Sequence, residues 1–407
     1  MLTEFDDYLC HQTLDAIEHP YTPDRRFYAR YFITFYDHAG EVLGITAIAN
    51  YPNTGVQDGY AVLVHGGQQR NLRVSRLLDH DPHVLAVGPV RVEVLEPLRR
   101  FRIICDPNDL GFSWDVECTT VSAPWERRRR FSARTGGRLS DVSLHWNQGY
   151  RCSGSVTIDG ERRAITPDRW SGVRDRSWGI GRFWEGEHSY GSNAAYGNFS
   201  GLRPAFQPND RGPYGLGGDP VGGKFGHHNS WVVFPERYLA VSFRPHIQTL
   251  GGALVPPWDS REEPAMILGI ERKRPVFDER GRIVSCDVVY TDEHGTPHEM
   301  TIRPLTYAWE AGCGYADMGT GYEMGKPLAR HVGIPHVEGE SRSLDDLGRF
   351  ARDQKVQGAA SSTIAFHVAE YRWGDVVGYG SLEADPNELA AYPYALYTPQ
   401  TVVTVEH

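Results

Sequence analysis

A run near the middle of the chain, residues 170–184, combines charged residues, glycine and tryptophan. Three tryptophans, Trp170, Trp178 and Trp184, flank Asp175, which lies between two arginines. Surface loops usually carry charge without tryptophan, and core strands usually carry aromatic residues without arginine. A segment with both is typical of a polar cluster buried against aromatic walls, where charges must be paired or hydrogen-bonded. The run is therefore either a structural plug or a reaction centre.

The Asp175 carboxyl group could serve as a general acid. Burial disfavours the charged form of a carboxyl group and raises its pKa, which keeps the proton available at neutral pH. Faces of indole rings stabilise a cation by about 1–2 kcal/mol each where water is excluded. Arg174 or Arg176 beside the carboxylate would have the opposite effect, because a guanidinium lowers a carboxyl pKa and favours a plain ion pair. Both interpretations stay open, as do core packing and substrate binding for the tryptophans.

Further candidates lie in the second half of the chain. His227 and His228 begin a strand-like run that contains Trp231, so alternation sends one histidine inward. That histidine could activate water, hold a substrate oxygen or make a simple buried hydrogen bond. Glu383, on the last expected strand, could face inward as a second acid or base, or lie at the surface. Tyr322 could line a cavity.

The spacing of other residues argues against metal and cofactor sites. His294 and His298 flank a turn, so they do not have the spacing of two ligands on one helix. The glycines at 312–321 lack the strand and helix that surround a dinucleotide-binding fingerprint. The sequence contains no Gly-x-Ser-x-Gly elbow and no phosphate-binding lysine loop. We therefore expect no metal and no cofactor.

Short strands must position these candidate residues. Runs rich in Val, Ile, Tyr and Phe alternate with turn signals such as Asp-Gly at 159–160. The expected strands are 26–36, 41–49, 60–65, 90–95, 99–105, 112–119, 153–158, 161–165, 230–234, 237–243, 265–272, 283–291, 299–304, 363–373 and 376–383. One short helix is expected before residue 25, and another is capped by Ser343 and runs to Lys355. The glycine-rich stretch 190–224 is either a linker or a lid.

This order of elements predicts an all-β protein of two tandem antiparallel β-barrels with a few short helices. Closure into barrels removes the exposed edges that so many short strands would otherwise leave. A chain of 407 residues also exceeds the range in which one core keeps growing. The expected domains are 1–185, which ends in the motif around Asp175, and 186–407, which contains the glycine-rich loop. A large double-sheet sandwich is the alternative.

The charge distribution and the hydrophobic pattern limit the partners. The net charge is −10 with acidic and basic residues interspersed, which argues against nucleic acid. No apolar run approaches the roughly 20 residues of a membrane helix. The first 19 residues lack the basic-then-apolar order of a secretion signal. We expect a cytoplasmic protein without a membrane span, and self-association into a homodimer stays open.

The motif resembles a known family. The sequences Trp-Asn-Gln-Gly-Tyr-Arg-Cys-Ser-Gly at 146–154, Asp-Gly-Glu at 159–161 and Gly-Val-Arg-Asp-Arg-Ser-Trp-Gly at 172–179 carry the resemblance. They are similar to the tandem lipocalin-like (calycin-type) proteins that include carotenoid hydratases such as hydroxyneurosporene synthase, tocopherol-cyclase-like proteins and fungal Diels-Alderases. Gly-Tyr-Gly-Ser-Leu-Glu at 378–383 looks like the closing strand of this family. The chain is most similar to a bacterial branch, many of whose members have His where this chain has Arg176.

The resemblance implies two lipocalin-like barrels and a cofactor-independent hydratase or cyclase, of the lyase or isomerase class. Its substrate would be a hydrophobic, isoprenoid- or polyketide-like molecule in a cavity between the barrels. Asp175, His228 and Glu383 would carry the acid–base chemistry. The substrate would be bound by Trp170, Arg176, Trp178, Trp184, Trp231 and Tyr322. A non-catalytic carrier or sensor of a hydrophobic ligand is the alternative, and a scaffold whose motif only locks two domains together is a third interpretation.

Overall fold

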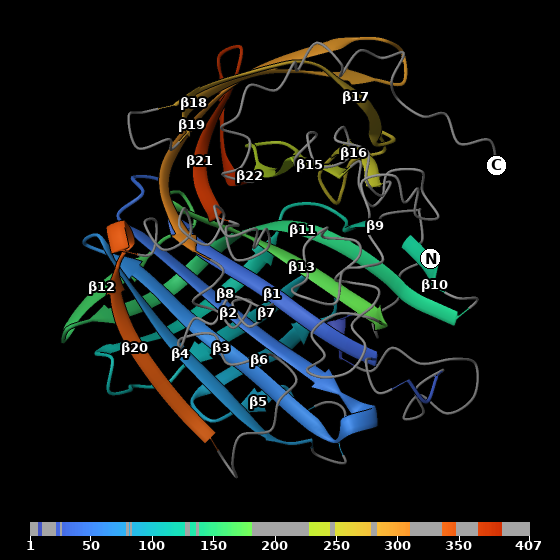
Figure 1. Ribbon diagram of the computed structural model, residues 1–407. Coiled ribbons are helices and arrows are strands. Elements are labelled where there is room, and N and C mark those ends of the chain that lie inside the picture. The colour runs from blue at the N-terminus through green and yellow to red at the C-terminus, as the bar shows by residue number, and fades with distance from the viewer. Residues whose placement is uncertain are drawn as a thin grey trace.

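The computed structural model describes residues 7–9, 22–24, 27–78, 81, 84–126, 131–135, 138–180, 228–244, 249–277, 283–309, 336–346 and 365–384. These residues confirm the all-β class, because nearly all of them lie in antiparallel strands or in the turns between strands (Figure 1). No helix in these ranges is long and apolar enough to span a membrane.

The first half of the chain forms one large curled sheet. Its path is β20-β4-β3-β2-β1-β13-β11-β8-β7-β6-β5, and the short strands β9, β10 and β12 pair with β11. The strands from this half are β1 (Phe27–Asp37), β2 (Val42–Tyr51), β3 (Val56–His65), β4 (Gln68–Leu77), β5 (Ala86–Val87), β6 (Val90–Glu96), β7 (Arg100–Cys105), β8 (Phe112–Thr120), β9 (Trp125–Glu126), β10 (Phe131–Thr135), β11 (Arg138–Ile158), β12 (Glu161–Ile165) and β13 (Trp170–Ile180).

The second half forms a closed eight-stranded barrel of β14, β15, β16, β17, β18, β19, β21 and β22. Its strands are β14 (His228–Val233), β15 (Tyr238–Arg244), β16 (Thr249–Val255), β17 (Ala265–Phe277), β18 (Ile283–Asp292), β19 (Pro297–Trp309), β21 (Ala365–Trp373) and β22 (Val376–Ala384). The ring closes because β14 pairs with both β15 and β22. Closure removes most free strand edges of the barrel, although β17 pairs with β16 only through its residues 265–267.

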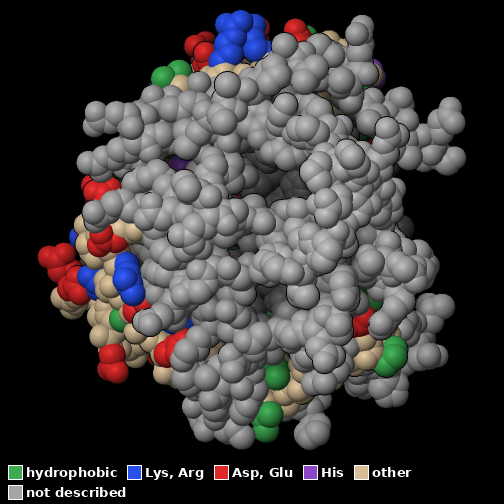
Figure 2. Space-filling model, in the orientation of Figure 1, with side chains coloured by type: hydrophobic (Ala, Val, Ile, Leu, Met, Phe, Trp, Pro, Cys, Tyr) green, Lys and Arg blue, Asp and Glu red, His purple; other side chains and the backbone are tan. Residues whose placement is uncertain are grey.

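One strand from the second half joins the first sheet. β20 (His336–Ser343) pairs antiparallel with β4 along its whole length. Arg73 of β4 forms ion pairs with Glu338 and Glu340 of β20, both at 2.9 Å. Charged side chains gather along this edge at the left of Figure 2. The domain boundary expected at 185/186 lies outside the described residues.

The helices are short. Pro52–Thr54 forms a 3-10 turn (η2). The helix expected after Ser343 begins as predicted, because the backbone N–H of Asp346 donates to Ser343 Oγ at 3.0 Å and residues 344–346 are helical. Its continuation to Lys355 lies outside the described residues, as do the glycine-rich stretch 190–224 and most of the helix expected before residue 25.

The curled sheet packs face to face against the barrel, and Figure 1 shows the two stacked one above the other. Tyr36 of β1 donates its hydroxyl to the backbone carbonyl of Tyr379 on β22 at 3.4 Å. A Cβ added to Gly149 of β11 would lie 2.6 Å from both Tyr238 and Val233 of the barrel. Only glycine therefore allows β11 to approach the barrel this closely.

The three largest apolar cores among the described residues result from this stacking. One fills the interior of the curled sheet, one fills the barrel, and the third, which we call the inter-sheet core, lies between them. Phe32 and Val173 from the sheet and Trp231 and Phe366 from the barrel belong to the inter-sheet core. Because side chains alternate along a strand, a strand at the contact between sheet and barrel contributes side chains to two cores. This explains why β1 is buried along its entire length.

Candidate functional site

The motif strand β13 presents its side chains alternately to two cores. Trp170 and Trp178 lie in the core inside the curled sheet, whereas Val173 lies in the inter-sheet core. Asp175 is on the same side as Val173, because residues two apart in a strand share a face. The structure therefore does not bring Trp170 and Trp178 to the Asp175 carboxylate, contrary to the expectation from sequence.

Asp175 contacts side chains of the neighbouring strand β11. Asn147 is its cross-strand partner, and Asn147 Nδ2 donates to Asp175 Oδ1 at 2.9 Å. His145 Nδ1 lies 3.3 Å from Oδ1 and 3.4 Å from Oδ2. The side chains of His145 and Asp175 are only 10% and 15% exposed. An imidazole and a carboxylate in contact can share a proton, so this pair has the composition of a general acid–base group.

The barrel wall carries a second carboxyl group in a similar setting. Glu383 of β22 is 5% exposed, and its cross-strand partner Asn229 donates Nδ2 to Glu383 Oε2 at 2.6 Å. Asn229 Oδ1 in turn accepts a hydrogen bond from Ser242 Oγ at 2.6 Å. Each carboxylate is thus held by the amide of an asparagine directly across the strand pair.

The strand registers bring the two carboxyl groups to the same level of the interface. Phe32 is the cross-strand partner of Asp175, and Phe366 is that of Glu383. The rings of Phe32 and Phe366 contact each other with centroids 5.4 Å apart. β13 also packs against β22 and β14. Asp175 and Glu383 therefore flank one aromatic contact from facing walls.

A buried guanidinium lies next to this level. Arg30 of β1 is 3% exposed and is aligned with Ser177, two residues beyond Asp175 on β13. Arg30 Nη2 donates to the hydroxyl of Tyr60 at 2.9 Å, and its guanidinium lies 5.7 Å from the centre of the Phe32 ring. The site therefore combines two carboxyl groups, one imidazole and one guanidinium with aromatic walls.

His228 lies elsewhere, inside the barrel. Its Nε2 is 2.7 Å from the hydroxyl of Tyr290 and 3.0 Å from Ser230 Oγ. Tyr371 also donates to Ser230 Oγ, at 2.9 Å. Burial raises the pKa of both tyrosines, so they stay protonated and act as hydrogen-bond donors. His228 and Asp175 thus belong to separate polar clusters.

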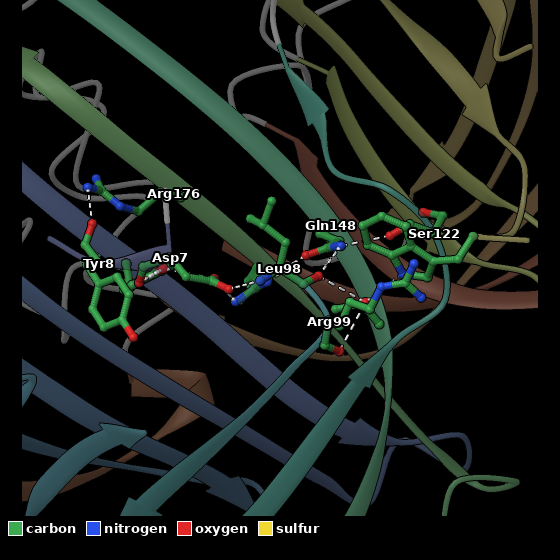
Figure 3. Close-up of polar contacts among 11 residues, drawn as sticks. Asp7, Tyr8, Leu98, Arg99, Ser122, Gln148 and Arg176 are labelled. Atoms are coloured by element: carbon green, nitrogen blue, oxygen red, sulfur yellow. Dashed lines mark hydrogen bonds and ion pairs between the residues drawn. The ribbon is translucent and has the colours of Figure 1, made fainter. Parts of the chain in front are cut away.

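Arg174 and Arg176 point into the curled sheet, on the face of β13 opposite to Asp175. Arg174 Nη1 lies 2.5 Å from Asp7 Oδ1, and both side chains are almost completely buried. Gln148 Oε1 accepts hydrogen bonds from Arg174 Nε at 3.1 Å and Nη2 at 2.6 Å. Figure 3 shows how this network runs from Arg176 through Asp7 to Gln148 and Ser122. Arg176 is therefore placed with Trp170 and Trp178 in the interior of the sheet.

Of the residues predicted from sequence, Asp175, Glu383 and Trp231 meet at the inter-sheet core. Trp184 and Tyr322 lie outside the described residues. The sequence analysis missed His145 and Asn147 as functional residues, although they alternate with Trp146 in the manner of a two-faced strand.

The described residues contain no group of three or more His, Cys, Asp or Glu side chains arranged to hold an ion. His298 instead places its Nε2 3.1 Å from Asp292 Oδ2. The barrel-end histidine is thus engaged with a single carboxylate.

Comparisons with known proteins give a partial family match and several similar solved structures. Residues 2–199 match a family of unknown function, DUF8625. No curated protein matches the chain. A provisionally assigned AttH protein from Nitrosomonas europaea is 12% identical, with 92% of this chain and 96% of that chain covered and a TM-score of 0.47. Kievitone hydratase from Nectria haematococca is 12% identical, with 89% and 90% covered and a TM-score of 0.43. CghA with Sch210972 is 8% identical, with 91% and 90% covered and a TM-score of 0.38.

Proposed function

We propose that the chain is a cofactor-independent hydratase or cyclase that protonates a hydrophobic, isoprenoid- or polyketide-like molecule between the curled sheet and the barrel. The observation that supports this most is the pair Asp175 and Glu383, each held by an asparagine beside the Phe32–Phe366 contact. An interface that served only for adhesion would gain little from these groups, because burying a charge costs several kcal/mol. The resemblance of the motif to hydratases and cyclases supports the reaction class.

The Asp175–His145 pair supplies the acid in this proposal. Its shared proton adds to one carbon of an isolated double bond, and the other carbon becomes a cation. The aromatic side chains of Phe32, Phe366 and Trp231, which belong to the inter-sheet core, would stabilise that cation. General acid catalysis of this kind contributes about 10²- to 10⁴-fold in rate.

Glu383 completes the proton balance. In a hydration, water bonds to the cation and passes one proton to the Glu383 carboxylate. In a cyclisation, a second double bond of the same molecule attacks the cation, and Glu383 removes a proton from the carbon skeleton. In both cases one proton is given and one is taken, so no net oxidation or reduction occurs and no redox cofactor is required.

The decisive experiment follows proton transfer directly. Apolar alkenes suggested by the neighbouring genes are incubated with the protein in D2O, and deuterium incorporation is measured by mass spectrometry. Asp175→Asn is expected to reduce incorporation by about 10²- to 10⁴-fold. Glu299→Gln, which removes a carboxylate from the exposed outer barrel surface, serves as the control.

Full deuterium incorporation by the Asp175→Asn protein would remove this carboxyl group from the mechanism. An apolar ligand that binds the native protein and is released unchanged, without deuterium, would favour the carrier over the enzyme. Native mass spectrometry after mild purification detects such a ligand.

A further inference from the structure

The interior of the curled sheet holds a complete set of donors for a carboxylate, and Asp7 occupies it. Asp7 Oδ1 lies 2.5 Å from Arg174 Nη1 and accepts a hydrogen bond from the Tyr31 hydroxyl at 3.0 Å. Asp7 Oδ2 accepts a hydrogen bond from the backbone N–H of Leu98. The three donors come from β13, β1 and the turn between β6 and β7. Asp7 itself is fully buried and belongs to none of these elements.

The donors are held in place by contacts that do not involve Asp7. Gln148 Oε1 accepts two hydrogen bonds from Arg174, and Gln148 Nε2 donates to the carbonyls of Leu98 at 2.8 Å and Ser122 at 2.7 Å. Figure 3 shows Gln148 with its contacts to Leu98 and Ser122. A receptor fixed in this way loses little conformational entropy when it binds a ligand.

Aromatic rings enclose the guanidinium groups. Arg174 lies 4.2 Å from the centre of the Phe101 ring and 4.8 Å from that of Trp146. Arg176, on the same face, lies 5.4 Å from Tyr31 and 5.3 Å from Trp178. We call the space around Asp7 inside the curled sheet, which Asp7 itself fills, the chamber. It offers two buried cations and a largely apolar wall, which suits a ligand with a carboxylate head and an apolar body.

Residues 7–9 have the chemistry of such a ligand. Asp7 supplies the carboxylate, and the carbonyl of Tyr8 accepts a hydrogen bond from Arg176 Nη2 at 2.7 Å. Leu9 contributes an apolar side chain to the core of the sheet. These three residues thus place an acidic head and an apolar group in the chamber, 167 positions away in sequence from Arg174.

We propose that this chamber is a binding site for a monocarboxylic acid with an apolar body, and that Asp7 occupies the site as an internal competitor. Stability of the fold alone does not require a buried carboxylate with these donors, because apolar residues of similar volume often replace a buried ion pair without loss of stability. The chamber lies on the face of β13 opposite to Asp175. The proposal therefore stands independently of the proposed catalytic function.

The first experiment replaces the internal carboxylate by an external one. In the full-length Asp7→Ala protein, acetate can fill the space left by the carboxylate. We expect acetate to raise the midpoint of thermal unfolding of this variant, whereas sodium chloride at equal ionic strength does not. The Asp7→Ala/Arg174→Met double variant should not respond to acetate. A response to acetate equal to that of chloride would overturn the proposal.

The second experiment measures affinity for an apolar acid. Decanoate is titrated into the wild-type and Asp7→Ala proteins by calorimetry, with decanol as the uncharged control. Loss of the competitor should tighten decanoate binding at least tenfold and leave decanol binding unchanged. Equal gains for decanoate and decanol would show that only apolar space had been created, and the proposal would fail.

The wild-type protein provides a test that needs no substitution. Decanoate that displaces Asp7 should increase hydrogen–deuterium exchange in the peptide that contains residues 7–9, and decanol should not. Unchanged exchange at saturating decanoate would contradict the role of Asp7 as a competitor, whether or not the Asp7→Ala protein folds.

Discussion

Gly149→Ala should separate the curled sheet from the barrel at one defined point. The new Cβ would lie 2.6 Å from Tyr238 Cδ2 and from Val233 Cγ2, and 2.8 Å from Tyr238 Cε2. Tyr238 and Val233 are fully buried, so neither side chain can move out of the way into solvent. Overpacking of a filled core costs about 1–3 kcal/mol, and we expect a loss of stability in this range.

The substitution should also reduce activity at the proposed site. Gly149 is aligned with Val173, two residue pairs along the strands from Asn147 and Asp175. A shift of the barrel at Gly149 should therefore widen the space between Asp175 and Glu383, and proton transfer to an alkene should slow. Urea unfolding followed by tryptophan fluorescence measures the stability, and deuterium incorporation measures the reaction.

A second substitution tests the cause. Val233→Ala removes the methyl group that the new Cβ would meet, so the Gly149→Ala/Val233→Ala protein should lose less stability than the sum of the two single variants. Strict additivity, or a Gly149→Ala protein within about 0.5 kcal/mol of wild type, would refute the packing of β11 against the barrel described above.

Two further predictions concern charged groups. Burial and the nearby Arg151 guanidinium lower the pKa of His38 from 6.5 to about 4, and its ring stacks on Tyr379. The unfolded chain takes up this proton near pH 6.5 and the folded chain only near pH 4, so stability should be complete above pH 6.5 and fall as the pH drops toward 4. Urea midpoints at pH 7 and 5 measure the loss, and His38→Phe, which keeps a ring against Tyr379, should reduce it. Arg174→Met leaves the Asp7 carboxylate buried without its cation, which should cost about 3–5 kcal/mol by urea unfolding, whereas Arg174→Met/Asp7→Leu should recover most of that loss.

Much of the fold could be predicted from sequence because apolar strands are recognisable by their composition. The expected strand 112–119 corresponds to β8, and 283–291 corresponds to β18. β4 and β20 were missed because they are rich in polar residues. β16 was missed because its third and fourth residues are glycines. Polar strands of this kind are held by their neighbours, which a local reading of the sequence cannot identify.

The candidate site was predictable in part for a related reason. Asp175 stands out by its type and its neighbours, and Glu383 by its place on the last strand. The strand character of the motif was missed, because arginine alternates there with aspartate instead of with an apolar residue. Recognition of β13 as a strand would have separated Asp175 from Trp178 at once. His145 and Asn147 could not be recognised as partners of Asp175, because the register between β11 and β13 joins residues 30 and 28 positions apart in sequence.

The pairing of β20 with β4 has a consequence for biosynthesis. β4 leaves the ribosome early, but the strand that covers its outer edge begins only at residue 336. Until then the nascent chain carries an open edge that can recruit a β-strand from another molecule. Arg73 of β4 gives the uncovered edge a positive charge, which repels the same edge of a second copy until Glu338 and Glu340 of β20 are synthesised.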